Sequence, residues 1–278
     1  MQETIPSPCV LAVGDFNVGK STLLNALLRQ EVLHSSREEG RALPTFVTRV
    51  SDTHDRYAAL SRSDGSLIPK THDEFLHIRK AEESSANFKA LAAGCVRSPF
   101  NSLVLVDTAG MSTDVCESVE IAGLSDQEDG LLLLVTDIEY WAAKHTMDFI
   151  AYHQEQFGES LIVVANKADH LNAIDIDRIQ DKAADRMEEY GIHPAPRFLT
   201  LSARLEQFRH EPRNEYRCRT KRRVRELCDA GFDTLRLALY EFEAARCRRE
   251  PRPGIDAVLK MPLAASFVAV QEGSTHEV

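Results

Sequence analysis

The chain has 278 residues, of which 43% are apolar and 27% charged, as is usual for a folded globular protein. This length fits one large domain or two small ones. The formal net charge of −10 argues against general affinity for nucleic acid.

The six cysteines show neither a C-x-x-C pair nor the spacing of a zinc site, so we expect reduced thiols. The N-terminal sequence lacks the basic and apolar regions of a secretory signal. Nor does any run approach the roughly 18 apolar residues that cross a bilayer. Together these features predict a cytoplasmic protein.

The first predicted elements are a buried strand at Cys9–Val13 and an apolar-periodic helix from about Gly19. Between them lies G-x-x-x-x-G-K-S, Gly14 to Ser21, the pattern of a phosphate-binding loop. Its backbone N–H groups and the helix N-terminus attract phosphate oxygens. We expect Lys20 to contact the β- and γ-phosphates and Ser21 to ligate Mg²⁺. The remaining residues expected to contact nucleotide in this loop are Asn17, Val18, Gly19 and Thr22.

The next motif is a loop entering a strand at Leu43–Val50, after a polar stretch that lacks periodicity. In a phosphate-loop GTPase the first switch lies here, and its threonine ligates Mg²⁺ and contacts the γ-phosphate. Thr45 is our candidate because it follows Pro44 at the junction of loop and strand. Thr48 is the alternative, although a β-branched residue inside a strand needs no functional explanation.

Residues 51–101 form an insert that is longer than a simple connection requires. Tyr57–Leu60 followed by Ser63–Ser66 predicts a strand and a hairpin turn. From residue 71 to about 93, the apolar spacing predicts helical segments, with Thr71 or Asp73 as N-cap. We recognise no catalytic or binding pattern in this insert.

A second buried strand, Ser102–Val106, ends in the D-x-x-G motif that Asp107 begins and Gly110 closes. In this position the aspartate holds Mg²⁺ through a water, and the glycine N–H contacts the γ-phosphate. Met111 follows, where Ras-like enzymes carry a glutamine that orients the attacking water. Water must then be oriented by a backbone group, a partner or a bound cation, or turnover is slow.

Two further strands are predicted at Gly130–Thr136 and Ser160–Ala165, with a helix from about Tyr140 to Phe157 between them. The later strand ends in N-K-x-D, Asn166 to Asp169. Here the aspartate accepts from the N1–H and 2-amino group of guanine, the asparagine bonds the O6/N7 side, and the stem of Lys167 covers the ring. We therefore expect GTP rather than ATP, because the wrong base leaves polar groups unpaired.

The last core elements are a helix at Asp175–Tyr190 and a strand at Arg197–Leu201. This strand delivers Ser202, Ala203 and Arg204, where a backbone N–H is expected to contact guanine O6. Position in the chain, rather than the short motif itself, supports this assignment.

A basic run covers residues 204–225, and an apolar helical stripe after it is expected to pack on the sheet. Neutralisation of the run by acidic groups of this chain is the default interpretation. An anionic membrane surface and RNA are the alternatives. We assign residues 1–250 to one domain and 251–278 to a C-terminal tail, either without fixed structure or as the remnant of a neck.

Taken together, the motifs predict an α/β fold, a doubly wound and mainly parallel sheet flanked by helices, as in phosphate-loop GTPases. The amino-acid sequences of Gly14–Leu28 and of Leu43–Arg49, followed by a long insert before D-T-A-G, resemble those of bacterial dynamin-like proteins. The resemblance implies Mg²⁺-dependent GTP hydrolysis to GDP, with G domains that pair as a homodimer across the nucleotide face. It also implies that Asn17 helps to hold K⁺ or Na⁺ against the phosphates, in a catalytic group with Lys20 and Thr45.

The same resemblance implies peripheral membrane association or a second GTPase as partner, although no segment has the length of a dynamin stalk. One alternative is an Era-like GTPase of ribosome or RNA maturation, whose phosphate loop has similar wording. The long insert and the lack of an RNA-binding module count against it, and nucleic acid is not the expected partner. Another alternative, based on Met111, is a nucleotide-gated regulator with low turnover.

Overall fold

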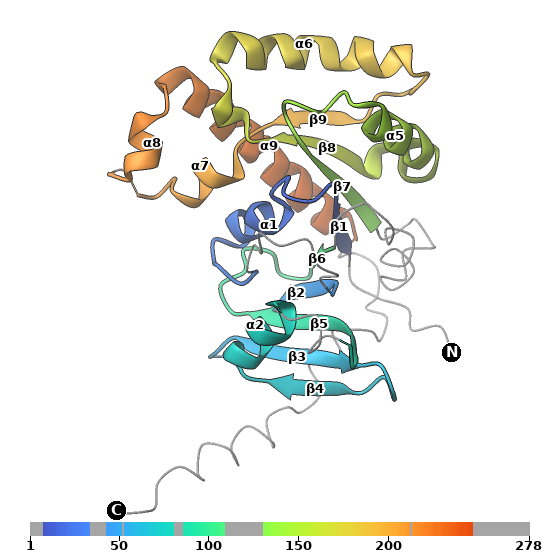
Figure 1. The fold of residues 1–278 in the computed structure, drawn as a ribbon, viewed down its shortest axis with the longest axis vertical. Helices are drawn as coiled ribbons and strands as arrows, with labels where there is room; N and C mark the ends of the chain where they lie inside the picture. The colour runs from blue at the N-terminus through green and yellow to red at the C-terminus, as the bar shows by residue number, and fades with distance from the viewer. Residues whose placement is uncertain are drawn as a thin grey trace, which may run out of the picture.

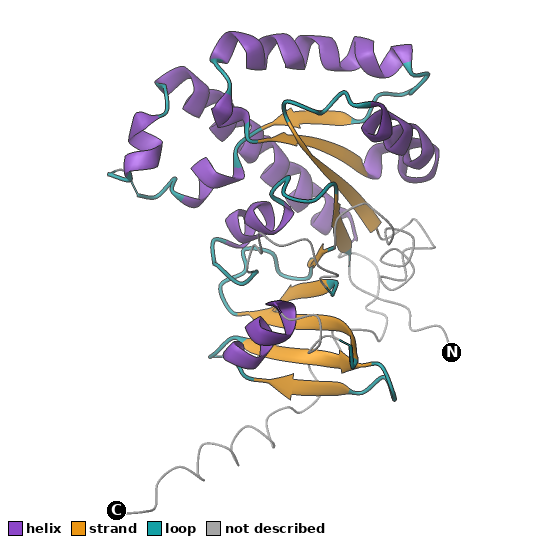
Figure 2. Ribbon diagram, viewed as in Figure 1, coloured by secondary structure: helices purple, strands orange, loops and turns teal. Residues whose placement is uncertain are grey.

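The computed structural model describes residues 8–33, 43–51, 53–80, 86–108, 130–211 and 213–246. Within these ranges the chain forms a nine-stranded sheet with helices on both faces (Figure 1, Figure 2). The strands are β1 Cys9–Val13, β2 Thr45–Arg49, β3 Arg56–Ser61, β4 Leu67–Lys70, β5 Phe88–Cys95, β6 Val104–Asp107, β7 Gly130–Asp137, β8 Leu161–Asn166 and β9 Arg197–Thr200. The helices are α1 Lys20–Leu28, α2 His72–Lys80, α5 Lys144–Phe157, α6 Ala173–Glu189, α7 Ala203–Gln207, α8 Glu215–Arg219 and α9 Arg222–Arg246, with short 3₁₀ turns η1 Gly158–Ser160 and η2 Ala168–His170.

The strand order is β4-β3-β5-β2-β6-β1-β7-β8-β9, so the sheet has two halves that meet at β6. From β6 to β9 all neighbours are parallel, with Cys9 of β1 opposite Val104 of β6 and Gly130 of β7. Beyond β6, β2 runs antiparallel to it, and β3 runs antiparallel to both β4 and β5. The predicted α/β fold with a mainly parallel sheet is confirmed, and the antiparallel pairs belong to the insert side.

Each face of the sheet carries its own apolar core. Helices α1, α2 and α9 cover one face, where Val10, Leu27 and Phe232 are buried together. Helices α5 and α6 cover the other, which contains Leu11 and Met147. Because β1 contributes side chains to both cores, it reads as a continuous apolar run, as expected for a central parallel strand.

The insert contains the main difference from the sequence prediction. Its hairpin and the helix after Thr71 are present: the Thr71 hydroxyl accepts from Glu74 N–H at 3.2 Å, and the Glu74 carboxylate accepts from Thr71 N–H at 2.8 Å. The predicted helix over Phe88–Ala93 is wrong, because this segment is strand β5. Alanine favours helix, but β5 pairs with β2 on one side and β3 on the other, and this tertiary pairing overrides local propensity.

The other predicted boundaries agree to within a few residues. The largest shift is in α5, which begins at Lys144 rather than near Tyr140, because residues 138–142 form a turn.

The long helix α9 packs on the sheet as its apolar stripe predicts, and it is also fixed by a buried charge. The carboxylate of Glu243 accepts from the backbone N–H of Ser102 at 2.6 Å and of Leu103 at 3.2 Å. These donors lie just before β6, so α9 is joined to the strand that carries Asp107.

Candidate functional site

The phosphate-binding loop joins β1 to α1 and needs glycine at both ends. Gly14 has φ of 146°, and a Cβ there would lie 1.9 Å from the carbonyl oxygen of Val135. Gly19 has φ of 93°, and a Cβ there would lie 2.5 Å from Nδ2 of Asn166. Both positions therefore favour glycine for their positive φ, and at Gly14 a side chain would also clash with rigid backbone.

Lys20 is the first residue of α1 and is buried beneath this loop. Its ammonium donates to the carbonyl oxygens of Gly14 and Asp15, at 2.8 Å in each case. Burial lowers the pKa of Lys20, while the charges of Asp107 and Asp15 oppose that shift. The ammonium thus lies within the loop that is expected to surround the phosphates.

The three predicted Mg²⁺ ligands, Ser21, Thr45 and Asp107, lie on different elements and converge. The hydroxyl of Ser21 donates to Oδ2 of Asp107 at 2.7 Å. Asp107 is 3% exposed, and its Oδ1 has no hydrogen-bond partner among the described residues. Two hydroxyls and a carboxylate with a free oxygen are hard oxygen donors, so these residues fit Mg²⁺.

All three side chains also contact one residue of the insert, Arg79 in the last turn of α2. Its Nη1 donates to Oγ1 of Thr45 at 2.5 Å, and its Nη2 donates to Oγ of Ser21 at 3.3 Å. The same Nη2 forms an ion pair with Oδ2 of Asp107. Sequence analysis missed this contact.

Between the two candidate switch threonines, this geometry favours Thr45. Thr45 is fully buried at the start of β2, and its register partner in β6 is Asp107. Thr48 is buried farther along the same strand, opposite Gly94 of β5. Of the two, Thr45 is therefore adjacent to the candidate metal ligands.

Asn166 joins the phosphate loop to the predicted base-binding loop. Its Nδ2 donates to the carbonyl oxygen of Val18 at 2.8 Å, and its Oδ1 accepts from the N–H of Ala203 at 2.9 Å. A side-chain amide has two donor hydrogens and two acceptor lone pairs, so one of each remains for a base. The Asn166 side chain therefore holds the two loops side by side.

Asp169 lies in η2 with a side chain that is 4% exposed. The Tyr216 hydroxyl of α8 donates a short hydrogen bond to its Oδ2. Burial first, and then the hydrogen bond to Asp169, raises the pKa of Tyr216 to about 12. Arg204 lies over the Tyr216 ring, with Cζ 4.0 Å from its centroid. The carboxylate expected to read guanine is thus held by an aromatic residue that sequence analysis did not single out.

Other predicted site residues occupy places that suit their roles to different degrees. Lys167 donates to Oδ2 of Asp137 at 2.8 Å, which fixes the end of its side chain. Ser202 caps α7 by accepting from the N–H of Leu205 at 3.1 Å, a structural use of its hydroxyl.

Asn17 is exposed with φ of 61°, and its side chain makes no hydrogen bond to a described residue. Thr22, the third residue of α1, is partly buried.

Gly110 and Met111 lie outside the described residues, as does the tail 251–278. Their predicted roles stay predictions.

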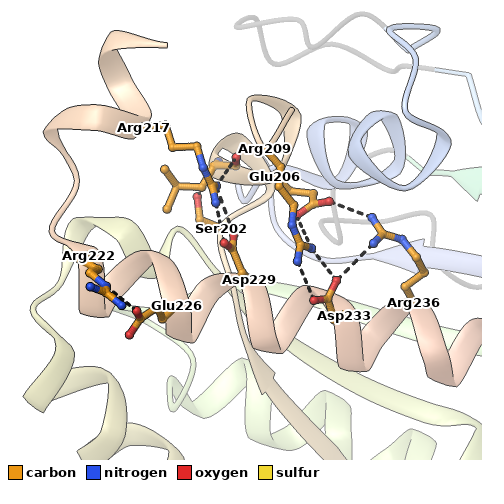
Figure 3. A network of polar contacts seen from close by, with 10 residues as sticks. Ser202, Glu206, Arg209, Arg217, Arg222, Glu226, Asp229, Asp233 and Arg236 are labelled. Atoms are coloured by element: carbon orange, nitrogen blue, oxygen red, sulfur yellow. Dashed lines mark hydrogen bonds and ion pairs between the residues drawn. The ribbon is translucent and has the colours of Figure 1, made fainter. Parts of the chain in front are cut away.

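Of the nine Lys and Arg residues in the basic run 204–225, four arginines form ion pairs with acidic groups of this chain (Figure 3 shows Arg209, Arg217 and Arg222). Arg217 bridges to Asp229 at 2.5 Å, and Arg209 binds both oxygens of Asp233, at 2.5 and 2.7 Å. Further pairs within the run join Arg219 to Glu215 and Arg222 to Glu226. Beyond the run, Arg236 pairs with Glu206. This pairing agrees with partial neutralisation of the run within the chain.

Comparison with known proteins now adds to this geometry. A family model described as the dynamin family matches residues 10–168, more than half of the chain. The chain belongs to the dynamin family. Membership confirms the resemblance to dynamin-like proteins, and it favours that class over the Era-like alternative.

The dynamin-family fold is also found in solved structures. Two structures of an oligomerised bacterial dynamin pair, described as a mechanism for long-range sensing and tethering of membranes, have TM-scores of 0.61 and 0.59 and 15% sequence identity. Each match covers 84% of this chain but 37% of the other, so the chain spans little more than a third of their length. No curated protein sequence matches this one significantly. Among the described helices, none has both the length and the apolarity needed to cross a membrane.

The residues that sequence analysis missed, Arg79 and Tyr216, share one property. Each contacts the site across a large sequence separation: 28 residues from Arg79 to Asp107 and 47 from Tyr216 to Asp169. No local motif marks either residue. In retrospect, the one available signal for Tyr216 is its place as an aromatic residue within a basic run.

Proposed function

We propose that this dynamin-family domain binds Mg·GTP in the site described above and hydrolyses it to GDP and phosphate. The observation that carries the proposal is the double hydrogen bond of Asn166, to Val18 O and to Ala203 N–H. It holds the phosphate loop beside the loop expected to read the base. A nucleotide that spans both must carry phosphates at one end and a guanine at the other.

Each residue of the site has a separate role in the proposed phosphoryl transfer. Lys20 exchanges its two loop carbonyls for phosphate oxygens and stabilises the charge that develops on them. Ser21, Thr45 and Asp107 hold Mg²⁺, which when bound neutralises phosphate charge. Asn166 and Asp169 orient the base, and Lys167 covers it. Gly110 is assigned the γ-phosphate contact that reports hydrolysis.

The orientation of the attacking water is assigned to a cation and a second G domain, because Met111 has no group that can hold water. Support for a cation comes from Asn17, whose exposed amide is not used by another described residue. K⁺ or Na⁺ beside it would supply positive charge to the phosphates. Support for pairing comes from the structural neighbours, which are an oligomerised pair. Peripheral membrane association is proposed on the same basis.

The test is GTP turnover per molecule, measured over a range of protein concentrations in KCl, NaCl and choline chloride. We expect turnover to rise with protein concentration and with K⁺ or Na⁺. Asn17→Ala should lose the cation effect while it still binds GTP, and Asn172→Ala serves as a control at an exposed helix cap.

Turnover that is flat in both variables would reject the dimer and cation parts of the proposal and favour a regulator with little hydrolysis. Absence of GTP binding in Mg²⁺ would reject the site itself.

A further inference from the structure

The guanidinium of Arg79 lies among the three candidate metal ligands. It contacts Thr45 Oγ1 at 2.5 Å and Ser21 Oγ at 3.3 Å, and it forms an ion pair with Asp107. The side chains of Arg79 and Asp107 are 7% and 3% exposed, so the ion pair is nearly closed to solvent. One positive group of the insert thus contacts the two hydroxyls and the carboxylate that are expected to bind a positive ion.

We propose that Arg79 competes with Mg²⁺ for the ligand set of Ser21, Thr45 and Asp107, so that Mg·nucleotide binds only when the guanidinium withdraws. This inference rests on the proposed function, because it takes the metal site from it. It gives the insert a direct part in nucleotide binding.

Simultaneous occupancy is excluded by geometry and by charge. Mg²⁺ requires oxygens at about 2.0–2.1 Å in near-octahedral arrangement, with lone pairs directed at the ion. Here Arg79 N–H groups use lone pairs of Thr45 and Ser21, which would ligate the ion directly, and of Asp107, which would hold it through a water. Two cations beside one buried carboxylate would also repel each other strongly, since a low local dielectric screens them little.

The rest of α2 is anchored independently of Arg79. Phe75 is fully buried and its ring lies 5.0 Å from that of Tyr57 in β3, and the first turn is closed by Thr71 and Glu74. Arg79 lies in the last turn, near the helix end at Lys80. Withdrawal of its side chain therefore changes the last turn of α2 without undoing the packing of the helix on β3.

The test compares Arg79→Ala with wild type and with Arg62→Ala, an exposed arginine of the same insert whose contact is to Phe88 O. One readout is the Mg²⁺ concentration at which binding of a fluorescent GDP analogue reaches half of its maximum. For Arg79→Ala we expect this concentration to fall about tenfold, the order expected when charge-assisted hydrogen bonds no longer have to be broken. The Arg62→Ala variant should match wild type.

A second readout is the melting temperature in EDTA without nucleotide. Here Arg79→Ala should be less stable than wild type, because Asp107 is left as a buried carboxylate without its cation. Arg79→Lys keeps the charge but loses the planar set of guanidinium N–H donors. It should lie between wild type and Arg79→Ala in both measurements. A lower Mg²⁺ requirement together with a lower melting temperature in EDTA is the result expected for competition between Arg79 and Mg²⁺.

A measurement on the wild-type chain makes the test independent of any substitution. Hydrogen exchange in the peptide covering residues 72–80 should be faster in Mg·GDP than in GDP with EDTA, because the last turn of α2 loses its contact with Asp107. An unchanged or raised Mg²⁺ requirement in Arg79→Ala, or slower exchange in Mg·GDP, would overturn the proposal while leaving the GTPase site intact. If wild type binds GTP without any dependence on Mg²⁺, both this proposal and the metal part of the proposed function are wrong.

Discussion

The predicted nucleotide-binding loops and the insert contribute to the same candidate site by different routes. In the loops, the functional side chains lie at or beyond the carboxyl end of a buried parallel strand: Asp107 ends β6, Asn166 ends β8, and Lys20 begins the helix that follows β1. In the insert, Arg79 reaches the site from the end of a helix that packs on antiparallel strands. In the loops, a sequence motif marks each residue that lies at the candidate site. In the insert, no motif marks Arg79, and only the tertiary structure brings it there.

The comparison also shows a difference in what holds each region together. The loops are joined by hydrogen bonds of buried side chains, above all the amide of Asn166. The insert is held by strand pairing and by aromatic contacts such as Tyr57 with Phe75. We therefore expect substitutions in the loops to affect binding most, and those in the insert to affect stability or metal dependence.

The largest effect is expected for Lys20→Ala, which removes the ammonium that lies within the phosphate loop. Affinity for Mg·GTP should fall by more than about 100-fold, the order of a lost charge-assisted contact to phosphate in a buried site. Isothermal titration measures this, with Lys70→Ala in the insert as control. Tight GTP binding by Lys20→Ala would refute the assignment of the phosphate loop.

Next in size is Asp169→Asn, which replaces the acceptor of the guanine N–H groups by an amide. The preference for GTP over xanthosine triphosphate should shift by about 100-fold or more toward xanthine, because an amide can donate to the xanthine 2-oxygen. Competition between the two nucleotides measures the shift. Asp181→Asn on the exposed face of α6 should leave the preference unchanged, and an unaltered preference in Asp169→Asn would contradict the base-reading role.

A smaller effect, on both stability and affinity, is expected for Asn166→Ala. Removal of the Asn166 amide leaves Val18 O and Ala203 N–H without their hydrogen-bond partner. We expect the free energy of unfolding to fall by about 2–3 kcal/mol. Denaturant unfolding measures the loss, and GTP titration should show weaker binding. Normal stability together with normal affinity would mean that the two loops do not depend on this link.

The smallest effect is expected in the insert, for Thr71→Ala at the cap of α2. The free energy of unfolding should fall by about 1 kcal/mol, and GTP affinity should not change. The backbone N–H of Thr71, and then its hydroxyl, hold the pKa of Glu74 below its ordinary value. This carboxylate therefore adds stability above its unfolded pKa, and the addition is lost as pH falls through the folded pKa. Thr71→Ala keeps the backbone N–H and removes only the hydroxyl, so its stability should depend on acid less than that of wild type. Denaturant unfolding at neutral and acid pH measures both effects, and equal stability of the two proteins at neutral pH would exclude the capping role.

Much of the candidate site could be predicted because its residues form local patterns. Gly14 and Gly19 are required by backbone geometry, and Asn166 follows a strand that is apolar throughout. The hairpin of the insert and the cap at Thr71 were likewise encoded by neighbouring residues.

The rest could not be predicted, because it depends on contacts between distant segments. Strand β5 contains Ala90 to Ala93, buried on both faces, so it lacks the alternation that marks a half-exposed strand. Arg79 is one arginine on a polar helix, and only the approach of α2 to β2 and β6 shows its role. Tyr216 is joined to Asp169 in the same way.

The central claim is that the loops of this dynamin-family domain form one Mg·GTP site, and calorimetric titration with GTP and with ATP in Mg²⁺ tests it most directly. We predict one GTP per chain, with ATP bound about 100-fold or more weakly, because adenine lacks the N1–H and 2-amino donors that guanine offers to the Asp169 carboxylate. Equal affinity for the two nucleotides, or GTP binding that Lys20→Ala and Asp169→Asn leave unchanged, would contradict the claim.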